Sequence, residues 1–418
     1  MQHFDLIVVG GGLTGVAAAV SAAREGASVL LVEATGGLGG AISANLVYPF
    51  MRYWTKAKDP DEIRYLSDGI FTEMRARQYG YIPPLDHTRF NPDSMQLVLD
   101  EMCVEAGVQV LFHATLCGAN TEERRVKSIL TATKAGLMEL TADTFIDATG
   151  DGDLMAFAGC DFQLGRESDG LCQPMTTCFR MSNVDVAAYK EDRPRIQALY
   201  KQLKAEGKLQ NPRENILVFF GLGEGIIHFN TTRVVKLDPT DPFDVSKAEM
   251  AARKQIFEMY TFLKENSPAF ANASICNVAI SIGVRESRKL KGEHILTAEE
   301  LKNCTRFPDA IALGNYDIDI HNPEGAGTSH YYFPDGQYYT IPYRSLLPRE
   351  VDNLLVAGRC ISATHEAQAS VRIMPICATM GQAAGIAAAV AKQTGTCVHD
   401  VSIALVQQKL REKGAAID

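Results

Sequence analysis

The chain has 418 residues, of which 46% are hydrophobic and 22% charged, and its net charge at pH 7 is −9. This length and composition are typical of a soluble globular protein with room for two domains. The acidic balance, without a basic tail or an arginine-rich stripe, argues against nucleic acid and an anionic membrane surface as partners.

The ten cysteines are scattered, and none forms a CxxC pair. Structural zinc sites and iron–sulfur clusters need closely spaced cysteines, so the sequence predicts no metal site. Unclustered thiols are typical of a reducing compartment. A predicted strand also begins within a few residues of Met1, where a targeting segment would otherwise lie. We therefore expect a cytoplasmic protein.

The first predicted element is a buried parallel strand over residues 5–9, because the run is short, continuous and β-branched. It leads into Gly10-x-Gly12-x-x-Gly15 and an alanine-rich helix over residues 14–25. In such a unit the first glycine permits a tight turn, the second lets a pyrophosphate approach the backbone, and the third lets the helix pack against the strand. The N-terminus of the helix then faces the phosphates.

A second predicted strand, residues 27–32, ends at Glu33. A carboxylate at this place accepts hydrogen bonds from both ribose hydroxyls and repels a 2′-phosphate, which disfavours NADP. The alternative is an ordinary strand–turn–helix, but strand, helix, second strand and acid all fall in register for a dinucleotide. The contacts predicted from this unit are Gly10, Gly12, Leu13, Thr14, Gly15, Glu33 and Ala34.

The stretch that follows, residues 36–43, contains four glycines. A bare backbone just past the ribose acid suits a ligand that continues beyond its first phosphate, which favours FAD over NAD. A flexible surface loop is the alternative. We predict that Gly39, Gly40 and Ala41 contact the cofactor.

The next elements prepare a return to the parallel sheet. Residues 61–77 show a helical apolar stripe, a second helix runs from Pro92 to Gly107, and a strand is expected over residues 108–112. Two alternating strands over residues 125–140 precede the run 144–147.

That run ends in Ala148, Thr149 and Gly150, a second predicted contact with the dinucleotide. Asp151 and Asp153 have the side chains of metal ligands, but no third ligand lies nearby in the sequence.

A third strand followed by glycine spans residues 354–359, and Pro375 then opens an alanine- and glycine-rich helix. The apolar stretch 373–391 has the length of a membrane span, but Gly381 and Gln382 within it favour a buried helix. Because the three glycine segments come from both ends of the chain, the termini should fold together around one long dinucleotide. FAD is the expected cofactor.

These motifs resemble the superfamily of FAD-dependent oxidoreductases that includes the flavoproteins of fumarate reductase and succinate dehydrogenase. They resemble more closely a group with the flavoprotein subunit of heterodisulfide reductase among its relatives. The matching stretches cover about half of the chain, namely residues 7–40, 145–159, 281–294, 341–346 and 353–391.

The resemblance implies that Leu116 touches the adenine and that the helix from Pro375 points its N-terminus at the flavin pyrimidine ring. It implies further contacts from Gly358, Arg359, Met374 and Cys377. Many members carry an acid where this chain has Arg359, and an arginine there can pair with pyrophosphate instead. We expect non-covalent FAD, since no histidine lies close to the first glycine loop.

Cys377 stands at the predicted start of the last helix, which should lower its thiol pKa. Without a CxxC partner, a small buried side chain is favoured over a redox thiol.

The sequence changes character near residue 161. The segment up to residue 334 is predicted to hold strands over 173–181, 216–220 and 226–232 and amphipathic helices over 184–206 and 245–266. The glycines of residues 221–225 are followed by strand residues, which argues against a second dinucleotide loop. We therefore predict an α/β fold with a Rossmann-like FAD-binding domain, discontinuous over residues 1–160 and 335–418, and an inserted α+β substrate domain, residues 161–334.

Four residues are the leading candidates for chemistry. His365 and Arg372 lie in the third glycine segment, which should pass the flavin ring. Arg285 and Arg288 lie in residues 283–292, the part of the resemblance that is most specific to the group. The planar fork of an arginine holds a carboxylate in two bonds, and a positioned histidine moves a proton. Ion pairs with neighbouring glutamates are the alternative for Arg285 and Arg288.

The leading hypothesis is an enzyme that transfers a hydride between flavin N5 and a small polar, anionic organic substrate. Arg372, Arg285 and Arg288 would hold the anionic group, and His365 would relay a proton. Two alternatives stay open: an electron-transfer flavoprotein subunit of a larger redox complex, and a non-catalytic dinucleotide-binding protein. The sequence does not identify the electron donor or acceptor, and it leaves open whether the protein forms a homo-oligomer.

Overall fold

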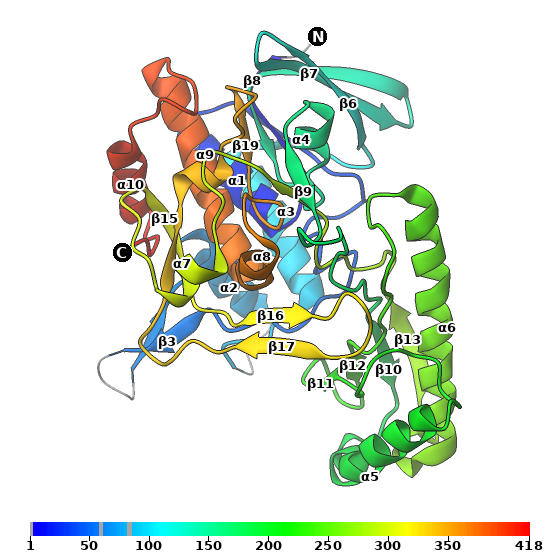
Figure 1. Ribbon diagram of the computed structural model, residues 1–418. Coiled ribbons are helices and arrows are strands. Elements are labelled where there is room, and N and C mark those ends of the chain that lie inside the picture. The colour runs from blue at the N-terminus through cyan, green and yellow to red at the C-terminus, as the bar shows by residue number, and fades with distance from the viewer. Residues whose placement is uncertain (1–2, 58–61, 82–85) are drawn as a thin grey trace.

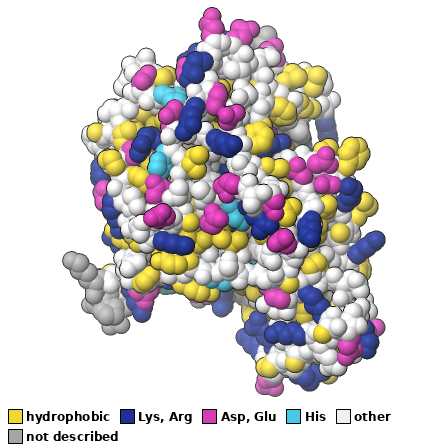
Figure 2. All heavy atoms as spheres, viewed as in Figure 1, with side chains coloured by type: hydrophobic (Ala, Val, Ile, Leu, Met, Phe, Trp, Pro, Cys, Tyr) yellow, Lys and Arg dark blue, Asp and Glu magenta, His cyan; other side chains and the backbone are white. Residues whose placement is uncertain are grey.

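The computed structural model describes residues 3–57, 62–81 and 86–418. A large α/β body holds both termini, and a smaller lobe with two long helices lies at the lower right of Figure 1. Figure 2 shows acidic and basic side chains intermingled over the face that Figure 1 presents.

The large body is built on one sheet that, among the described residues, has seven strands in the order β5-β2-β1-β8-β7-β6, with β19 also paired to β8. The pairs among β1, β2, β5, β8 and β19 are parallel, and β6 and β7 are antiparallel. The strands are β1 (His3–Val9), β2 (Val29–Val32), β5 (Gln109–Leu111), β6 (Thr115–Glu122), β7 (Arg125–Thr133), β8 (Gly136–Asp147) and β19 (Leu354–Val356).

The register of this sheet brings the three glycine segments together. Val9 pairs with Val32 on one side and with Asp147 on the other, and Asp147 pairs with Val356. The four strands therefore end at the same edge, and each glycine segment begins there. This confirms the predicted Rossmann-like α/β fold, in which ligands bind at the carboxyl ends of parallel strands.

Helices cover the sheet, and the closest contact between them joins the two ends of the chain. A Cβ on Gly381 would lie 2.1 Å from the carbonyl oxygen of Thr14, and one on Gly385 would lie 2.1 Å from that of Ala18. The helices of the body are α1 (Leu13–Arg24), α2 (Ile70–Tyr81), α3 (Pro92–Ala106), α4 (Asp153–Phe157), α7 (Ala298–Lys302), α8 (His365–Val371), α9 (Met374–Thr394) and α10 (Ile403–Glu412).

The helix α9 is the one described helix that is long and apolar enough to cross a membrane, and 94% of its most apolar window is buried inside the protein. Its burial against α1 agrees with the predicted core helix.

The smaller lobe contains a four-stranded antiparallel sheet ordered β11-β12-β10-β13. One face of this sheet packs against two helices and the short turn η1 (Pro268–Phe270). The sheet, the helices and the turn share a core of buried side chains such as Phe179, Tyr200 and Phe229. The elements are β10 (Phe179–Ser182), β11 (Val218–Phe219), β12 (Ile227–Phe229), β13 (Ser274–Val278), α5 (Val186–Ala205) and α6 (Pro242–Asn266).

Short two-stranded ladders complete the chain. They are β3 (Trp54–Lys56) with β4 (Ile63–Tyr65), β9 (Phe162–Leu164) with β14 (Arg288–Leu290), β15 (Ala310–Gly314) with β18 (Tyr339–Pro342), and β16 (Ile318–His321) with β17 (Thr328–Tyr331); the turn η2 (Tyr343–Leu346) follows β18.

Part of the predicted insertion packs against the large body. Ile311 and Ile318 lie in the same core as α1 and α9, whereas the separate core of the smaller lobe draws on residues 179–273 and a few side chains packed against it. The division into 1–160 with 335–418 and 161–334 stays a prediction.

The helix predicted over residues 61–77 is wrong in its first part. Residue 61 lies outside the described residues, residues 63–65 form β4, and α2 begins only at Ile70. Gly69 stands at the junction with φ +108, and a Cβ there would meet the side-chain oxygen of Gln382 at 2.4 Å. The turn at Gly69 and its close contact with α9 therefore place the start of the helix at Ile70.

Candidate active site

A cleft of about 570 Å³ opens where the parallel strands end. Its volume is in the range of small-molecule sites, roughly 300–1,000 Å³. The predicted cofactor contacts that line it are Gly10, Gly12, Leu13, Thr14, Glu33, Ala34, Gly39, Gly40, Ala41, Leu116, Ala148, Thr149, Gly150, Arg359, Met374 and Cys377. The three glycine segments thus share one cleft.

Two of the predicted glycines support the cleft from behind. A Cβ on Gly15 would lie 1.8 Å from the Gly10 carbonyl oxygen, and one on Gly358 would meet the side chain of Thr14 at 2.7 Å. Gly12 differs, because a Cβ there would meet nothing within 4 Å and would stand in the cleft. Its bare backbone is the surface that a pyrophosphate can approach.

The second glycine-rich stretch packs on the first. Gly39 donates its N–H to the Gly11 carbonyl at 2.8 Å, and a Cβ on Gly40 would lie 2.9 Å from the Cα of Gly12. Some of these glycines therefore serve contact between the two loops as well as room for a ligand.

Two helix N-termini open into the cleft without a side-chain cap. α1 begins after Gly12 and α9 after Ile373, and neither of these N-cap residues accepts a hydrogen bond on its side chain. Free N–H groups and the positive end of each helix dipole favour an anionic ligand group. The free N–H groups at the start of α1 and α9 therefore fit the phosphates and the ring of FAD.

Glu33 stands at the end of β2 as predicted. Its carboxylate accepts hydrogen bonds from the N–H of Gly11 at 2.6 Å and from the N–H of Thr35 at 2.7 Å. These bonds hold the carboxylate at the cleft wall, where a ribose would lie.

The loop after β8 carries two ion pairs. Arg359 binds Asp151 at 2.8 Å and Arg288 binds Asp153 at 2.8 Å, so each arginine is neutralised by a carboxylate. Burial, together with the neighbouring Asp151, raises the pKa of Asp153. Arg359 reaches the cleft from this pair, whereas Arg288 packs over the ring of Phe162.

Asp147, at the end of β8, holds this loop in place. It accepts hydrogen bonds from the N–H groups of Thr149 and Met155 at 3.0 and 2.8 Å. Complete burial raises the pKa of Asp147 to about 6.

Two of the four predicted catalytic residues line the cleft beyond the glycine loops. Arg285 donates to the Pro174 carbonyl at 2.6 Å and to the Asn230 side chain at 3.3 Å. Arg372 lies 3.7 Å from Asp319, and its Nε has no partner. Burial and the nearby Arg372 lower the pKa of Arg285. Both arginines therefore offer positive charge to a ligand.

His365, the third, is the first residue of α8 and is 4% exposed. Its Nδ1 lies 2.7 Å from Glu286, and Glu286 also binds Lys289 at 2.6 Å. The imidazole and the lysine together lower the pKa of Glu286, although burial opposes them. Among the described residues, the cleft lining includes neither His365 nor Glu286.

Several lining residues were not predicted. Thr176, Cys178, Asn230 and Glu249 reach the cleft from the insertion, and Asp319 supports Arg372 from behind. The polar run of residues 230–232, which follows Phe229, is a local signal that could have indicated Asn230.

The expectation of a lowered thiol pKa at Cys377 is wrong. The side chain is 7% exposed, and its burial raises the pKa to about 12, which outweighs the helix N-terminus. In the part of the chain that the structure describes, no three His, Cys, Asp or Glu side chains are grouped to hold a metal ion.

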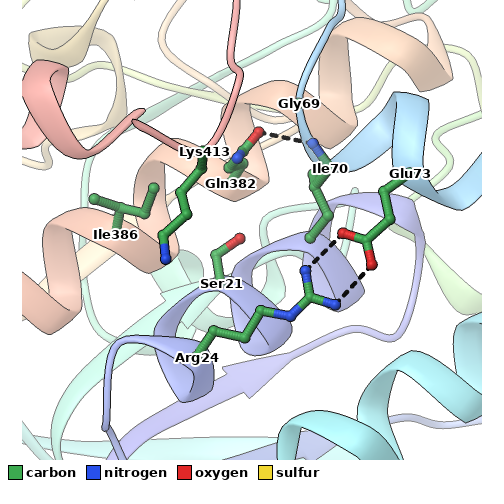
Figure 3. A pocket seen from close by; sticks show the side chains of 8 residues that line it. All are labelled: Ser21, Arg24, Gly69, Ile70, Glu73, Gln382, Ile386 and Lys413. Atoms are coloured by element: carbon green, nitrogen blue, oxygen red, sulfur yellow. Dashed lines mark hydrogen bonds and ion pairs between the residues drawn. The ribbon is translucent and has the colours of Figure 1, made fainter. Parts of the chain in front are cut away.

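A second pocket, of about 220 Å³, lies at the other end of α1 between α2 and α9 (Figure 3). Its charged groups are paired: Arg24 binds Glu73 at 2.6 Å, and Lys413 binds Glu25 at 3.0 Å. Gln382 accepts the N–H of Ile70 at 3.1 Å. The pocket therefore offers a ligand little that is not already bonded.

The chain shows a distant similarity to several solved structures. One is a geranylgeranyl bacteriochlorophyll reductase-like protein from Thermoplasma acidophilum, at 13% identity and a TM-score of 0.48, covering 99% of this chain and 84% of that one. Another is the flavin-dependent brominase Bmp2, at 12% identity and 0.47, covering 98% and 83%. A third is p-nitrophenol 4-monooxygenase PnpA from Pseudomonas putida DLL-E4, at 12% identity and 0.45, covering 98% and 82%.

No curated protein shows significant sequence similarity to the chain. The sequence of residues 5–410 matches the family described as FAD dependent oxidoreductase. With its three glycine segments around one cleft, the chain belongs to the family of FAD-dependent oxidoreductases, and FAD is its cofactor.

Proposed function

We propose that this oxidoreductase transfers a hydride between flavin N5 and a carbon of a small polar organic substrate that carries an anionic group. The observation that supports the proposal is the pair of arginines, Arg285 and Arg372, in the cleft beyond the glycine loops. Arg285 comes from outside the three glycine segments, and Arg372 lies in the third segment well past Gly358, so both are available to a second ligand.

The surroundings of Arg372 favour a carboxylate. Among the residues that the structure describes, its one acidic neighbour within ion-pair distance is Asp319 at 3.7 Å. That carboxylate also accepts the Tyr316 hydroxyl at 2.9 Å. Hydrogen bonding from His321 and the charge of Arg372 keep the pKa of Asp319 well below its ordinary range, although burial opposes them. Asp319 therefore stays ionised and orients Arg372 through Nη2, and the Nε of Arg372 is left to donate to a substrate carboxylate.

Bound FAD supplies the hydride chemistry, and the protein supplies position and charge. Arg285 and Arg372 would orient the substrate, and the N-terminus of α9 would stabilise negative charge that develops on the ring side of the cleft. His365 stays the proposed proton relay. Glu286 fixes its Nδ1, which leaves Nε2 to accept or release a proton.

The test uses the holoprotein under anaerobic conditions with a panel of hydroxy, amino and unsaturated acids and their neutral amides. Acids should bleach or perturb the flavin absorbance, and the matching amides should not. R372Q should raise the KM or Kd of the active acid about 10- to 100-fold, which is the effect of losing a charged hydrogen bond. The control is R195Q, since Arg195 pairs with Asp192 on the surface of α5.

If the amides reduce the flavin as efficiently as the acids do, the proposal that the substrate carries an anionic group is wrong. The finer grouping with fumarate reductase or heterodisulfide reductase relatives and the cytoplasmic location stay proposals.

A further inference from the structure

We propose a second anion subsite, built on Arg180 and His228 between the smaller lobe and the large body. The substrate would then carry a second anionic group, a carboxylate or a phosphoryl group, at its far end. This inference rests on the proposed function for the first anionic group, at Arg285 and Arg372.

The backbone register places the two side chains on one face. Arg180 of β10 pairs directly with His228 of β12 in the antiparallel sheet. Their chain neighbours Phe179 and Phe229 belong to the core of the smaller lobe, on the opposite face. Arg180 and His228 therefore point away from that core.

The large body covers this outer face. The ring of Tyr48 lies 5.7 Å from the ring of His228, and the Tyr48 hydroxyl donates to the Phe220 carbonyl at 3.3 Å. Phe90 in turn packs on Tyr48 with ring centroids 5.4 Å apart. Arg180 and His228 are thus enclosed between the two parts of the chain.

Within the described part of the chain, four side-chain nitrogens of these two residues have no hydrogen-bond partner. Arg180 is 9% exposed and its Nε and Nη2 make no hydrogen bond, and His228 is 0% exposed with both ring nitrogens unpartnered. Buried polar groups are nearly always bonded, so four unpartnered nitrogens in one place call for a ligand. Nε and Nη2 form one edge of the guanidinium, and such an edge binds two oxygens of a carboxylate or phosphate side by side.

The charge of this region also calls for an anion. Cys178 feels the positive charges of Arg180, Arg213 and Arg285 together, and Arg213 also has a buried Nη1 without a partner. Burial lowers the pKa of Arg180, and the charge of Asp93 opposes this effect. An uncompensated buried cation is unfavourable, and an anionic ligand group would neutralise it.

The subsite adjoins the cleft. Cys178, two residues before Arg180, and Val47, next to Tyr48, both line the cleft. A substrate held at Arg285 and Arg372 would therefore extend along this wall toward Arg180.

The test compares ligands of equal chain length that differ only at the far end. Holoprotein is titrated with straight-chain acids that end in methyl, carboxylate or phosphonate, and the perturbation of flavin absorbance gives each Kd. In wild type, a terminal anion should tighten binding at least 10-fold over the methyl-ended acid. The carboxylate and phosphonate arms show which group the subsite takes.

R180Q should bring that ratio to about one, and R180K, which keeps the charge but loses the Nε edge, should give an intermediate ratio. R195Q, on the exposed face of α5, should keep the wild-type ratio. Flavin content and melting temperature show whether each variant is folded. If R180Q does not fold, the comparison of R180K with wild type provides the test.

Methyl-ended acids that bind, with no advantage for a terminal anion in wild type, would overturn the subsite alone. So would an undiminished ratio in both Arg180 variants, which would mean that the terminal anion binds away from Arg180. Failure of every acid to bind would overturn the proposed function together with the subsite.

Discussion

The carbonyl oxygen of Gly10 lies 1.8 Å from the place that a Cβ on Gly15 would take. The contact joins the end of β1 to the first turn of α1, and no rotamer change can relieve it because both groups are backbone. Gly12, between them, has φ −67 and open space on its Cβ side. The two glycines therefore serve different purposes.

We expect G15A to lower both stability and FAD binding, because overpacking of this kind costs about 1–3 kcal/mol or more. G12A should keep the melting temperature of the apoprotein, since its backbone suits any residue, yet weaken FAD binding at least 10-fold because the methyl group stands in the cleft. Thermal denaturation of the apoproteins and fluorescence titration with FAD separate the two effects. Wild-type FAD affinity in G12A would contradict this assignment.

His365 gives a prediction about the rate of flavin reduction. H365A should slow flavin reduction by about 10²–10⁴-fold while FAD stays bound. E286Q should act in the same direction, because Glu286 holds the imidazole. H294A is the matched control, since His294 pairs with Glu300 in a half-exposed position. Unchanged reduction in stopped-flow measurements with H365A would remove this histidine from the mechanism.

The burial of His228 predicts that the folded protein loses stability as the pH falls. Burial, with the charge of Arg180, lowers its pKa from 6.5 to about 3. Above pH 6.5 neither folded nor unfolded protein binds this proton, so the full stability is present. As the pH falls from 6.5 toward 3, only the unfolded chain binds the proton, and the stability at pH 5 is lower by about 2 kcal/mol.

H228Q cannot take up that proton, so its melting temperature should fall less than that of wild type between pH 7 and pH 5. Asp147 acts in the opposite sense, because its pKa is raised to about 6 and folded protein binds its proton more readily. The comparison of wild type with H228Q cancels that contribution. Equal losses of melting temperature in the two proteins would show that His228 is protonated in the folded state.

Cys377 should be chemically inert in the folded protein. Its burial raises the thiol pKa to about 12, so very little thiolate forms at pH 8. Cys117 and Cys276 are exposed and should react with iodoacetamide first. Mass spectrometry of peptides from briefly alkylated holoprotein measures the order. Early labelling of Cys377 would restore the redox thiol as a hypothesis.

The cofactor half of the site could be predicted because each glycine segment carries its own local pattern. The spacing of Gly10, Gly12 and Gly15 and the runs before Gly150 and Gly358 each describe a strand followed by a sharp turn. Parallel strands then bring such turns to one edge without further information. The residues at its two ends also sufficed for α3, which begins at Pro92 and is closed by Gly107, as predicted. The structure adds that Gly107 has the left-handed conformation.

The substrate half could not be predicted, because its contacts depend on tertiary packing. Thr176, Asn230 and Asp319 come from separate segments and show no common spacing. The sequence indicated that Arg288 and Arg359 carry charge, but not that Asp153 and Asp151 would take it up.

The strand predicted over residues 173–181 is only partly correct, and the reason also lies in tertiary packing. Its regular ladder begins only at Phe179, because Met175 and Thr176 form isolated bridges with Val234 and Gly283, on two different segments. Alternation of side chains cannot show that a strand changes partners along its length.

The contact of α1 with α9 also sets an order of events during synthesis. About 350 residues separate the end of α1 from the start of α9, and at roughly 5–20 residues per second the ribosome needs about 20 to 70 seconds to make them. Until then the small apolar face of α1 has no native cover, and β19 has not joined β8. The cleft that holds FAD is therefore complete only after the start of α9 has been made, since Ile373, Met374 and Cys377 line it.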